Sequence, residues 1–291
     1  MWRAVVPGVI GIIIAAMAGT AVSWAGNWPQ WRGPNNDGLA AEKNVPVEWA
    51  ADKNVLWKLR LPGQGESTPC LWGEQIFLTC TADKDIVLLC VGTDGKERWR
   101  RTISTSGAVR YRNPSGVPIT NAASSPSTDG QHVWAFVGDG TLVCYRVNGE
   151  EVWRKDLQKE YGRFQIQFGT HWTPVLYKGT LYLQIMHRGA QLLVALDAPT
   201  GQQKWKVDRP GYGRGESPDT YASALIWEGE GGPLLIAHGN DYCTAHRLDD
   251  GSEVWRVMGL NPRERQDWRF VSSPLVSPDL IIVPSCKDAP L

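Results

Sequence analysis

The sequence predicts an all-β fold, a β-propeller built from four-stranded antiparallel blades, on three observations. A Gly-x-x-x-Trp pattern recurs four times, and its tryptophans, Trp99, Trp153, Trp205 and Trp255, are spaced 54, 52 and 50 residues apart. A second marker of three residues, usually with a hydroxyl residue before a final proline, recurs at residues 67–69, 124–126, 172–174, 222–224 and 272–274, at intervals of 57, 48, 50 and 50 residues. Short apolar runs separated by turns fill each period. Short strands in a repeat of about 50 residues are typical of a propeller.

The first 25 residues are expected to be a secretory signal peptide. Arg3 precedes an apolar stretch over residues 9–18, and Ser23-Trp24-Ala25 places small residues at the two positions that a signal peptidase reads. An uncleaved anchor is the alternative, although the apolar stretch is short for a membrane span. We therefore expect an exported protein, periplasmic or secreted, with no membrane span after signal cleavage.

Each period is expected to hold four short strands, and the second period shows them most clearly. Strand-like segments cover residues 124–128, 133–137, 141–147 and 151–155. Asp129-Gly130 and Asn148-Gly149 supply the positive φ angles that two-residue hairpins need. No long stretch of helical period lies between them. The propeller is expected over residues 55–291, after an N-terminal extension over 26–54 whose Trp28 and Trp31 should pack against the side or bottom of the ring.

Both ends of the predicted propeller are irregular. Residues 55–59, which carry Trp57, look like the fourth strand of a blade without the first three, so we expect them to close a blade begun elsewhere. Residues 272–274 and 280–283 predict two strands of a fifth blade, after which the chain stops. The propeller is therefore expected to be incomplete, with about four full blades plus parts. Two alternatives explain this: the chain is a piece of a larger propeller, or it forms a small ring with irregular closure. The first is favoured, because an unpaired apolar strand edge is a liability in a complete protein.

Charge and cysteine content narrow the function classes. The 30 basic and 30 acidic side chains cancel and no Lys/Arg run exists, which argues against nucleic acid as a partner. The six cysteines contain no CxxC pair, which argues against a zinc ribbon or attached haem, and no histidines have metal-ligand spacing. Cys90 and Cys144 each lie nine residues before a repeat tryptophan, so we expect equivalent small apolar positions in neighbouring strands.

One copy of the first marker resembles the tryptophan-docking motif of quinoprotein-like propellers, which carry pyrroloquinoline-quinone-like (PQQ-like) repeats. It reads Ala195-x-Asp197-x-x-Thr200-Gly201-x-x-x-Trp205. The opening of the mature chain, residues 27–38, is similar to exported bacterial proteins with such repeats. The resemblance implies structural docking roles for the motif residues and for the equivalent tryptophans, Trp57, Trp99, Trp153 and Trp255.

The resemblance fits both enzymes and non-enzymes. Related propellers include quinone-dependent alcohol and sugar dehydrogenases, which hold the quinone and Ca²⁺ on the axis, and a barrel-assembly lipoprotein of the outer membrane that binds no cofactor. The adjacent Cys-Cys pair often found in the dehydrogenases is missing from this sequence, and no local motif supplies their Glu, Asn and Asp. No catalytic residue and no cofactor is therefore predicted, with PQQ and Ca²⁺ kept as the alternative.

The candidate ligand site lies where the loops that lead into the first strands gather, at one end of the propeller axis. Alignment on the second marker gives five residues one equivalent position: Glu66, Ala123, His171, Tyr221 and Val271. Glu66, His171 and Tyr221 are predicted to form a polar cluster at the funnel mouth, to which Asn121 and Arg269 would add. The alternative is that these side chains only bond loop backbone and cap strand ends.

These observations favour an exported, non-catalytic binding or assembly scaffold. Its partners would be proteins, or a small molecule or polysaccharide outside the cytoplasm. A quinone- and Ca²⁺-dependent dehydrogenase is the first alternative. A carbohydrate-binding module of a larger exported enzyme, with sugars stacked on Trp172 and Trp268, is the second.

Overall fold

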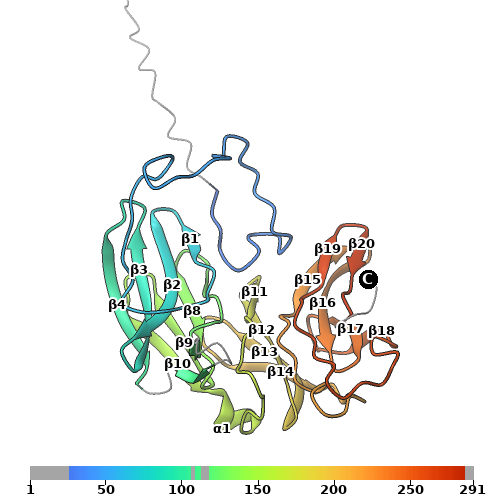
Figure 1. Ribbon diagram of the computed structural model, residues 1–291. Helices are drawn as coiled ribbons and strands as arrows, with labels where there is room; N and C mark the ends of the chain where they lie inside the picture. Colours follow the sequence, from blue (N-terminus) through green and yellow to red (C-terminus); the bar gives the residue numbers. More distant parts are fainter. Residues whose placement is uncertain (1–25, 106–108, 113–117, 286–291) are drawn as a thin grey trace, which may run out of the picture.

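The computed structural model describes residues 26–105, 109–112 and 118–285, so the predicted signal peptide lies outside the described residues. Within them the chain forms four four-stranded antiparallel sheets and two β-hairpins (Figure 1). This arrangement confirms the predicted propeller blades.

The strands of each sheet follow one another in chain order. The first blade contains β1 (Cys70–Trp72), β2 (Gln75–Ala82), β3 (Asp85–Gly92) and β4 (Glu97–Ser104). The second contains β7 (Ser127–Thr128), β8 (His132–Phe136), β9 (Thr141–Arg146) and β10 (Glu151–Asp156). The third contains β11 (Val175–Tyr177), β12 (Thr180–His187), β13 (Ala190–Asp197) and β14 (Gln203–Asp208). The fourth contains β15 (Leu225–Gly229), β16 (Gly232–Gly239), β17 (Tyr242–Arg247) and β18 (Glu253–Val257).

Three smaller elements complete the described chain. The hairpin of β19 (Leu275–Ser277) and β20 (Leu280–Ile282) follows the fourth blade and supplies the two strands expected of a fifth. A hairpin of β5 (Val109–Arg112) and β6 (Pro118–Thr120) joins the first two blades, and the short helix α1 (Leu157–Tyr161) follows the second. The blades succeed one another along an open arc (Figure 1).

The first strand of every blade is the innermost. Contacts run from β1 to β7, β7 to β11, β11 to β15 and β15 to β19, so these short strands lie side by side around the axis. Each has only one strand partner within its own sheet, so no strand of that sheet pairs with its other edge, on the axial side.

The hydrophobic core lies between blades. On β12, Leu183 and Ile185 pack with the cluster that includes side chains of the second blade, whereas Tyr182 and Met186 pack with the cluster that includes side chains of the fourth. This division follows from the two-residue period of a strand, which sends alternate side chains to opposite faces. Both faces of the middle blades are therefore apolar.

The cysteines fill small positions in these faces, as predicted. Cys90 on β3 and Cys144 on β9 are buried, and in the strand register they lie opposite Trp99 and Trp153. Ala195 occupies the corresponding place opposite Trp205. The five cysteines in the described part of the chain are buried free thiols.

Two expectations about the N-terminal segment are wrong. Residues 55–59 form no strand, because no strand of the described chain pairs with them. Trp28 and Trp31 do not pack against the side or bottom of the ring, because the segment 28–32, here called the strap, runs along the innermost strands. Trp28 pairs with Leu71 of β1 through two hydrogen bonds of 2.9 and 2.8 Å.

Candidate functional site

The residues around the axis enclose a cavity of about 530 Å³, here called the axial cavity. Its wall comes from the loops that lead into β1, β7, β11, β15 and β19, and from the strap. The lining residues are Trp31, Arg32, Glu66, Thr68, Ala123, Ser125, His171, Thr173, Tyr221, Ser223, Val271, Ser272, Ser273, Leu275, Ile282 and Pro284. All five residues aligned on the second marker are among them.

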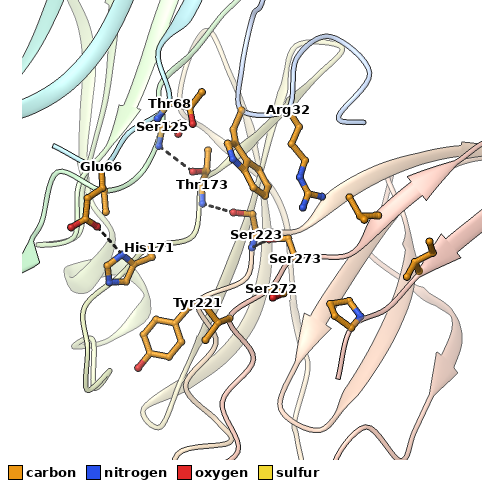
Figure 2. A pocket seen from close by; sticks show the side chains of 16 residues that line it. Arg32, Glu66, Thr68, Ser125, His171, Thr173, Tyr221, Ser223, Ser272 and Ser273 are labelled. Carbon is orange, nitrogen blue, oxygen red and sulfur yellow. Dashed lines mark hydrogen bonds and ion pairs between the residues drawn. The ribbon is translucent and has the colours of Figure 1, made fainter. Parts of the chain in front are cut away.

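The three polar side chains predicted at the funnel mouth lie together. His171 Nδ1 is 3.7 Å from Glu66 Oε2, and its ring centroid is 5.9 Å from that of Tyr221 (Figure 2). The other ring nitrogen of His171, Nε2, lies 3.0 Å from the carbonyl oxygen of Phe168, which fixes the ring. Burial raises the pKa of Tyr221 to about 12, so its hydroxyl is protonated at neutral pH.

The other two predicted residues, Asn121 and Arg269, are not among the lining residues of the axial cavity. Asn121 is buried, and its carbonyl oxygen accepts a hydrogen bond of 2.8 Å from the N–H of Gly138. Arg269 forms an ion pair of 3.2 Å with Glu216 and lies over the ring of Phe168. The contact of Asn121 is made by its backbone, whereas those of Arg269 hold its side chain away from the cavity lining.

A row of hydroxyls, which the sequence reasoning missed, joins the blades at the cavity wall. Each backbone N–H in the row donates to the hydroxyl of the next blade: Thr68 to Ser125 (2.9 Å), Ser125 to Thr173 (3.1 Å), Thr173 to Ser223 (2.9 Å) and Ser223 to Ser273 (2.9 Å). Figure 2 shows this row crossing the cavity. We call these five residues the hydroxyl row. The signal was present, because the middle residue of the second marker is Ser or Thr in all five copies.

Arg32 of the strap supplies the guanidinium group that lines the axial cavity. The sequence reasoning missed this residue as well. Arg32 donates a hydrogen bond to the carbonyl oxygen of Pro274 and lies 4.4 Å from the Trp31 ring centroid. Among the described residues, no carboxylate lies within ion-pair distance of Arg32. Burial lowers the pKa of Arg32, although the side chain stays charged at neutral pH.

The repeat tryptophans lie against the blade that follows them. The indole N–H groups of Trp57, Trp99, Trp153 and Trp205 donate to the carbonyl oxygens of Thr93, Val147, Ala198 and Leu248, at 2.7, 2.9, 3.0 and 2.9 Å. Each ring covers a turn glycine of positive φ, respectively Gly95, Gly149, Gly201 and Gly251, where a β-carbon would lie within 3.0 Å of the indole. Trp255 packs with the cluster that includes β19 and β20 side chains.

The most complete copy of the motif is held by its own side chains. Asp197 accepts hydrogen bonds from the N–H and the hydroxyl of Thr200, at 3.1 and 2.6 Å. Gly201 follows with a φ of +70°, which favours glycine because it has no β-carbon. These contacts fix the turn on which the ring of Trp153 lies.

The two tryptophans considered for sugar stacking are buried. Trp172 is 2% exposed and stacks on Phe136 with ring centroids 4.3 Å apart. Trp268 is 1% exposed and donates its indole N–H to Leu260 O at 3.0 Å. Neither ring offers a face to a carbohydrate.

The donors around the axial cavity do not fit Ca²⁺. This ion takes six to eight oxygen ligands, commonly including several carboxylates, whereas Glu66 is the one carboxylate lining the cavity. Within the described ranges, no group of three or more His, Cys, Asp or Glu side chains is placed to hold a metal. The described residues also include no helix long and apolar enough to cross a membrane.

Two solved structures match the chain at low sequence identity. The quinohemoprotein alcohol dehydrogenase of Comamonas testosteroni matches 80% of this chain and 49% of its own, with 12% identity and a TM-score of 0.53. BamB of Moraxella catarrhalis matches 68% of this chain and 53% of its own, with 12% identity and a TM-score of 0.46. The chain thus spans about half the length of each of these structures.

Comparison with protein sequences assigns the chain to a family, which the solved structures alone do not. A search of curated protein sequences found no match. A family model, however, matches residues 83–283, which include the second, third and fourth blades entirely and the last two strands of the first. Its description is outer membrane protein assembly factor BamB. The chain therefore belongs to this family of PQQ-like propeller proteins.

Proposed function

We propose that this chain is an exported, non-catalytic scaffold that binds a protein partner at the axial cavity. The observation that carries the proposal is the composition of the cavity. One carboxylate, one imidazole and one guanidinium face it, and four of its hydroxyls accept hydrogen bonds from neighbouring blades. Such a wall recognises a ligand through fixed donors and acceptors.

The family supports a protein as the partner. Its description names an outer membrane assembly factor, a role that consists of contacts with other proteins. Export agrees with the predicted signal peptide over residues 1–25. The rigid rim of a propeller suits this role, because its loops are held by blade-to-blade contacts and lose little entropy on binding.

The dehydrogenase alternative is weakened by the same cavity. A quinoprotein needs metal ligands beside a base on the axis, and Glu66 would have to serve both purposes. The second alternative, a carbohydrate module, loses its two stacking candidates through the burial of Trp172 and Trp268.

Thermal melting with PQQ and Ca²⁺, together with dye-linked alcohol oxidation, separates the scaffold from the enzyme. We expect no turnover and no rise in melting temperature beyond that produced by Ca²⁺ alone, because a ligand of the folded state must stabilise it. Turnover that disappears in Glu66→Gln would overturn the proposal.

Photocrosslinking from the cavity tests binding itself. A photoreactive side chain at Val271, which is 63% exposed and lines the cavity, should capture a discrete partner in the exported fraction. The matched control carries the same group at Lys96, an exposed residue of the β3–β4 turn. Equal labelling from both positions, or none from Val271, would contradict the proposal.

A further inference from the structure

Five equivalent backbone N–H groups occur on the innermost strands. They belong to the residue two places after each copy of the second marker: Leu71, Thr128, Leu176, Ile226 and Val276. These residues lie on β1, β7, β11, β15 and β19, each of which has an axial edge that no strand of its own sheet pairs. An unpaired edge of this kind is a template for an extended chain.

The strap occupies the first three positions. The N–H of Leu71 donates to Trp28 O at 2.8 Å, that of Thr128 to Pro29 O at 2.8 Å, and that of Leu176 to Gln30 Oε1 at 3.0 Å. Three successive residues therefore serve three successive blades. In every case the acceptor is an uncharged amide oxygen.

The last two N–H groups point to the same edge and have no such acceptor. Gly229 and Gly232 close the β15–β16 hairpin as a hydrogen-bonded pair. Because hydrogen-bonded and non-hydrogen-bonded pairs alternate along antiparallel strands, Ile226 belongs to a non-hydrogen-bonded pair. Its N–H therefore points away from β16, toward the axis. The Ser277–Leu280 pair places the N–H of Val276 in the same way. No described residue accepts a hydrogen bond from either group. Because Ile226 is 3% exposed, leaving its N–H unpaired is costly.

A cleft of about 230 Å³ lies at these two residues and shares no lining residue with the axial cavity. Trp227 forms one wall, held by an indole hydrogen bond of 2.9 Å to Ser277 O, and Tyr177, bonded to Glu228, forms another. Residues 34–37, which follow the strap in the chain, also line the cleft. The charged lining residues are Asp37 and Glu228, so the cleft disfavours an anion.

We propose that this cleft, here called the inner-edge cleft, binds an extended, uncharged or cationic peptide segment of a protein partner. Amide carbonyls of the peptide accept from the N–H groups of Ile226 and Val276, as the strap does at the first three positions. Trp227 and Tyr177 supply the apolar surface for its side chains. The site is separate from the axial cavity, so it stands or fails independently of the ligand proposed there.

Titration with a synthetic peptide tests this directly. The probe is residues 27–32 of this chain, Asn-Trp-Pro-Gln-Trp-Arg, acetylated and amidated, added to the ¹⁵N-labelled full chain. We expect saturable amide shifts centred on Ile226 and Val276, with those of Leu71, Thr128 and Leu176 unchanged. Shifts confined to the first three positions would mean exchange with the strap, and that outcome or no binding overturns the proposal.

Two matched comparisons identify the donors and the charge preference. Val276→Pro removes the axial N–H without breaking a ladder bond, whereas Val276→Ala keeps it, so only the proline variant should weaken binding, by about tenfold. If Val276→Pro does not fold, the wild-type chain is titrated with the peptide in which Glu replaces both Gln and Arg, which gives it a net negative charge. This anionic probe should bind at least about threefold more weakly beside Asp37 and Glu228. Equal affinity in either comparison contradicts the proposal.

Discussion

Replacing Trp205 with alanine should lower the free energy of unfolding by about 3–5 kcal/mol. The indole is 8% exposed, packs near Tyr182 and covers Gly251 of the fourth blade. Burial of such a ring removes roughly 200 Å² from water, which at about 25 cal/mol per Å² corresponds to about 5 kcal/mol. The β-carbon that remains and partial relaxation of the neighbours reduce this value. The carbonyl oxygen of Leu248 also loses the shorter of its two hydrogen bonds and keeps the one from the Tyr182 hydroxyl, at 3.4 Å.

Urea unfolding followed by circular dichroism measures the change, with a second probe to establish that the transition has two states. A loss of this size lowers the melting temperature by roughly 6 °C or more in a domain of this length. If Trp205→Ala melts within about 2 °C of the wild type, the indole does not act as a blade-to-blade contact.

Trp57→Ala is the matched control because it removes the same chemistry from a more exposed position. Trp57 donates to Thr93 O and covers Gly95, but it is 39% exposed and its segment joins no sheet. Its replacement should cost only about 1–2 kcal/mol. Equal losses for the two variants would show that burial of the ring does not set the contribution.

Three further substitutions test buried polar groups. Burial lowers the pKa of His187 to about 4, below the 6.5 of an unfolded histidine, so the unfolded state binds more protons in this window and stability falls on acidification. Between pH 7.5 and 5 the wild type should lose on the order of 2 kcal/mol more than His187→Gln in urea unfolding, and identical slopes would exclude His187 as the cause. Arg209, 1% exposed, donates to the carbonyl oxygens of Ala237, Gly239 and Tyr242, so Arg209→Met should cost roughly 3 kcal/mol or more, and Arg209→Lys should recover less than half of the loss. Ser223→Ala removes the acceptor of the Thr173 N–H and should cost about 1–2 kcal/mol, whereas Ser223→Thr should stay near the wild type in thermal melting.

The blades could be predicted because the same local chemistry is repeated. Each period needs a glycine for its turn, a tryptophan for the next blade and alternating apolar residues for two buried faces, and all three leave a mark at fixed spacing. The same alignment found the cavity residues Glu66, His171 and Tyr221, because equivalent positions in a propeller meet at the axis.

Asn121 and Arg269 show where alignment stops being informative. Both lie further upstream in the connecting loops, two residues before the aligned position. There the chain has not reached the innermost strand, so equivalent positions do not meet at the axis. The side chain of Arg269 is oriented by its ion pair with Glu216, a residue 53 positions away that no periodic pattern indicates.

The strap could not be predicted from periodicity, because it occurs once. Its residues also read as a surface segment, with two tryptophans, a proline and an arginine outside the repeats. Yet the repeats themselves create the surface that it covers: a strand with one partner in its sheet leaves every second N–H without an acceptor. The need for an acceptor is therefore periodic even though the segment that supplies it is not.

The difference between five repeated N–H groups and a strap that pairs only three of them indicates where the propeller can bind a partner. Five equivalent N–H groups face the axis, and one segment of five residues reaches three of them before Arg32 turns to Pro274. Had the strap continued along the inner edges, Ile226 and Val276 would have been paired as well. It instead leaves them beside a cleft whose walls, Trp227 and Tyr177, are already fixed by hydrogen bonds. A fixed wall next to unpaired donors binds with little loss of conformational entropy, which is the condition under which a short peptide can be held.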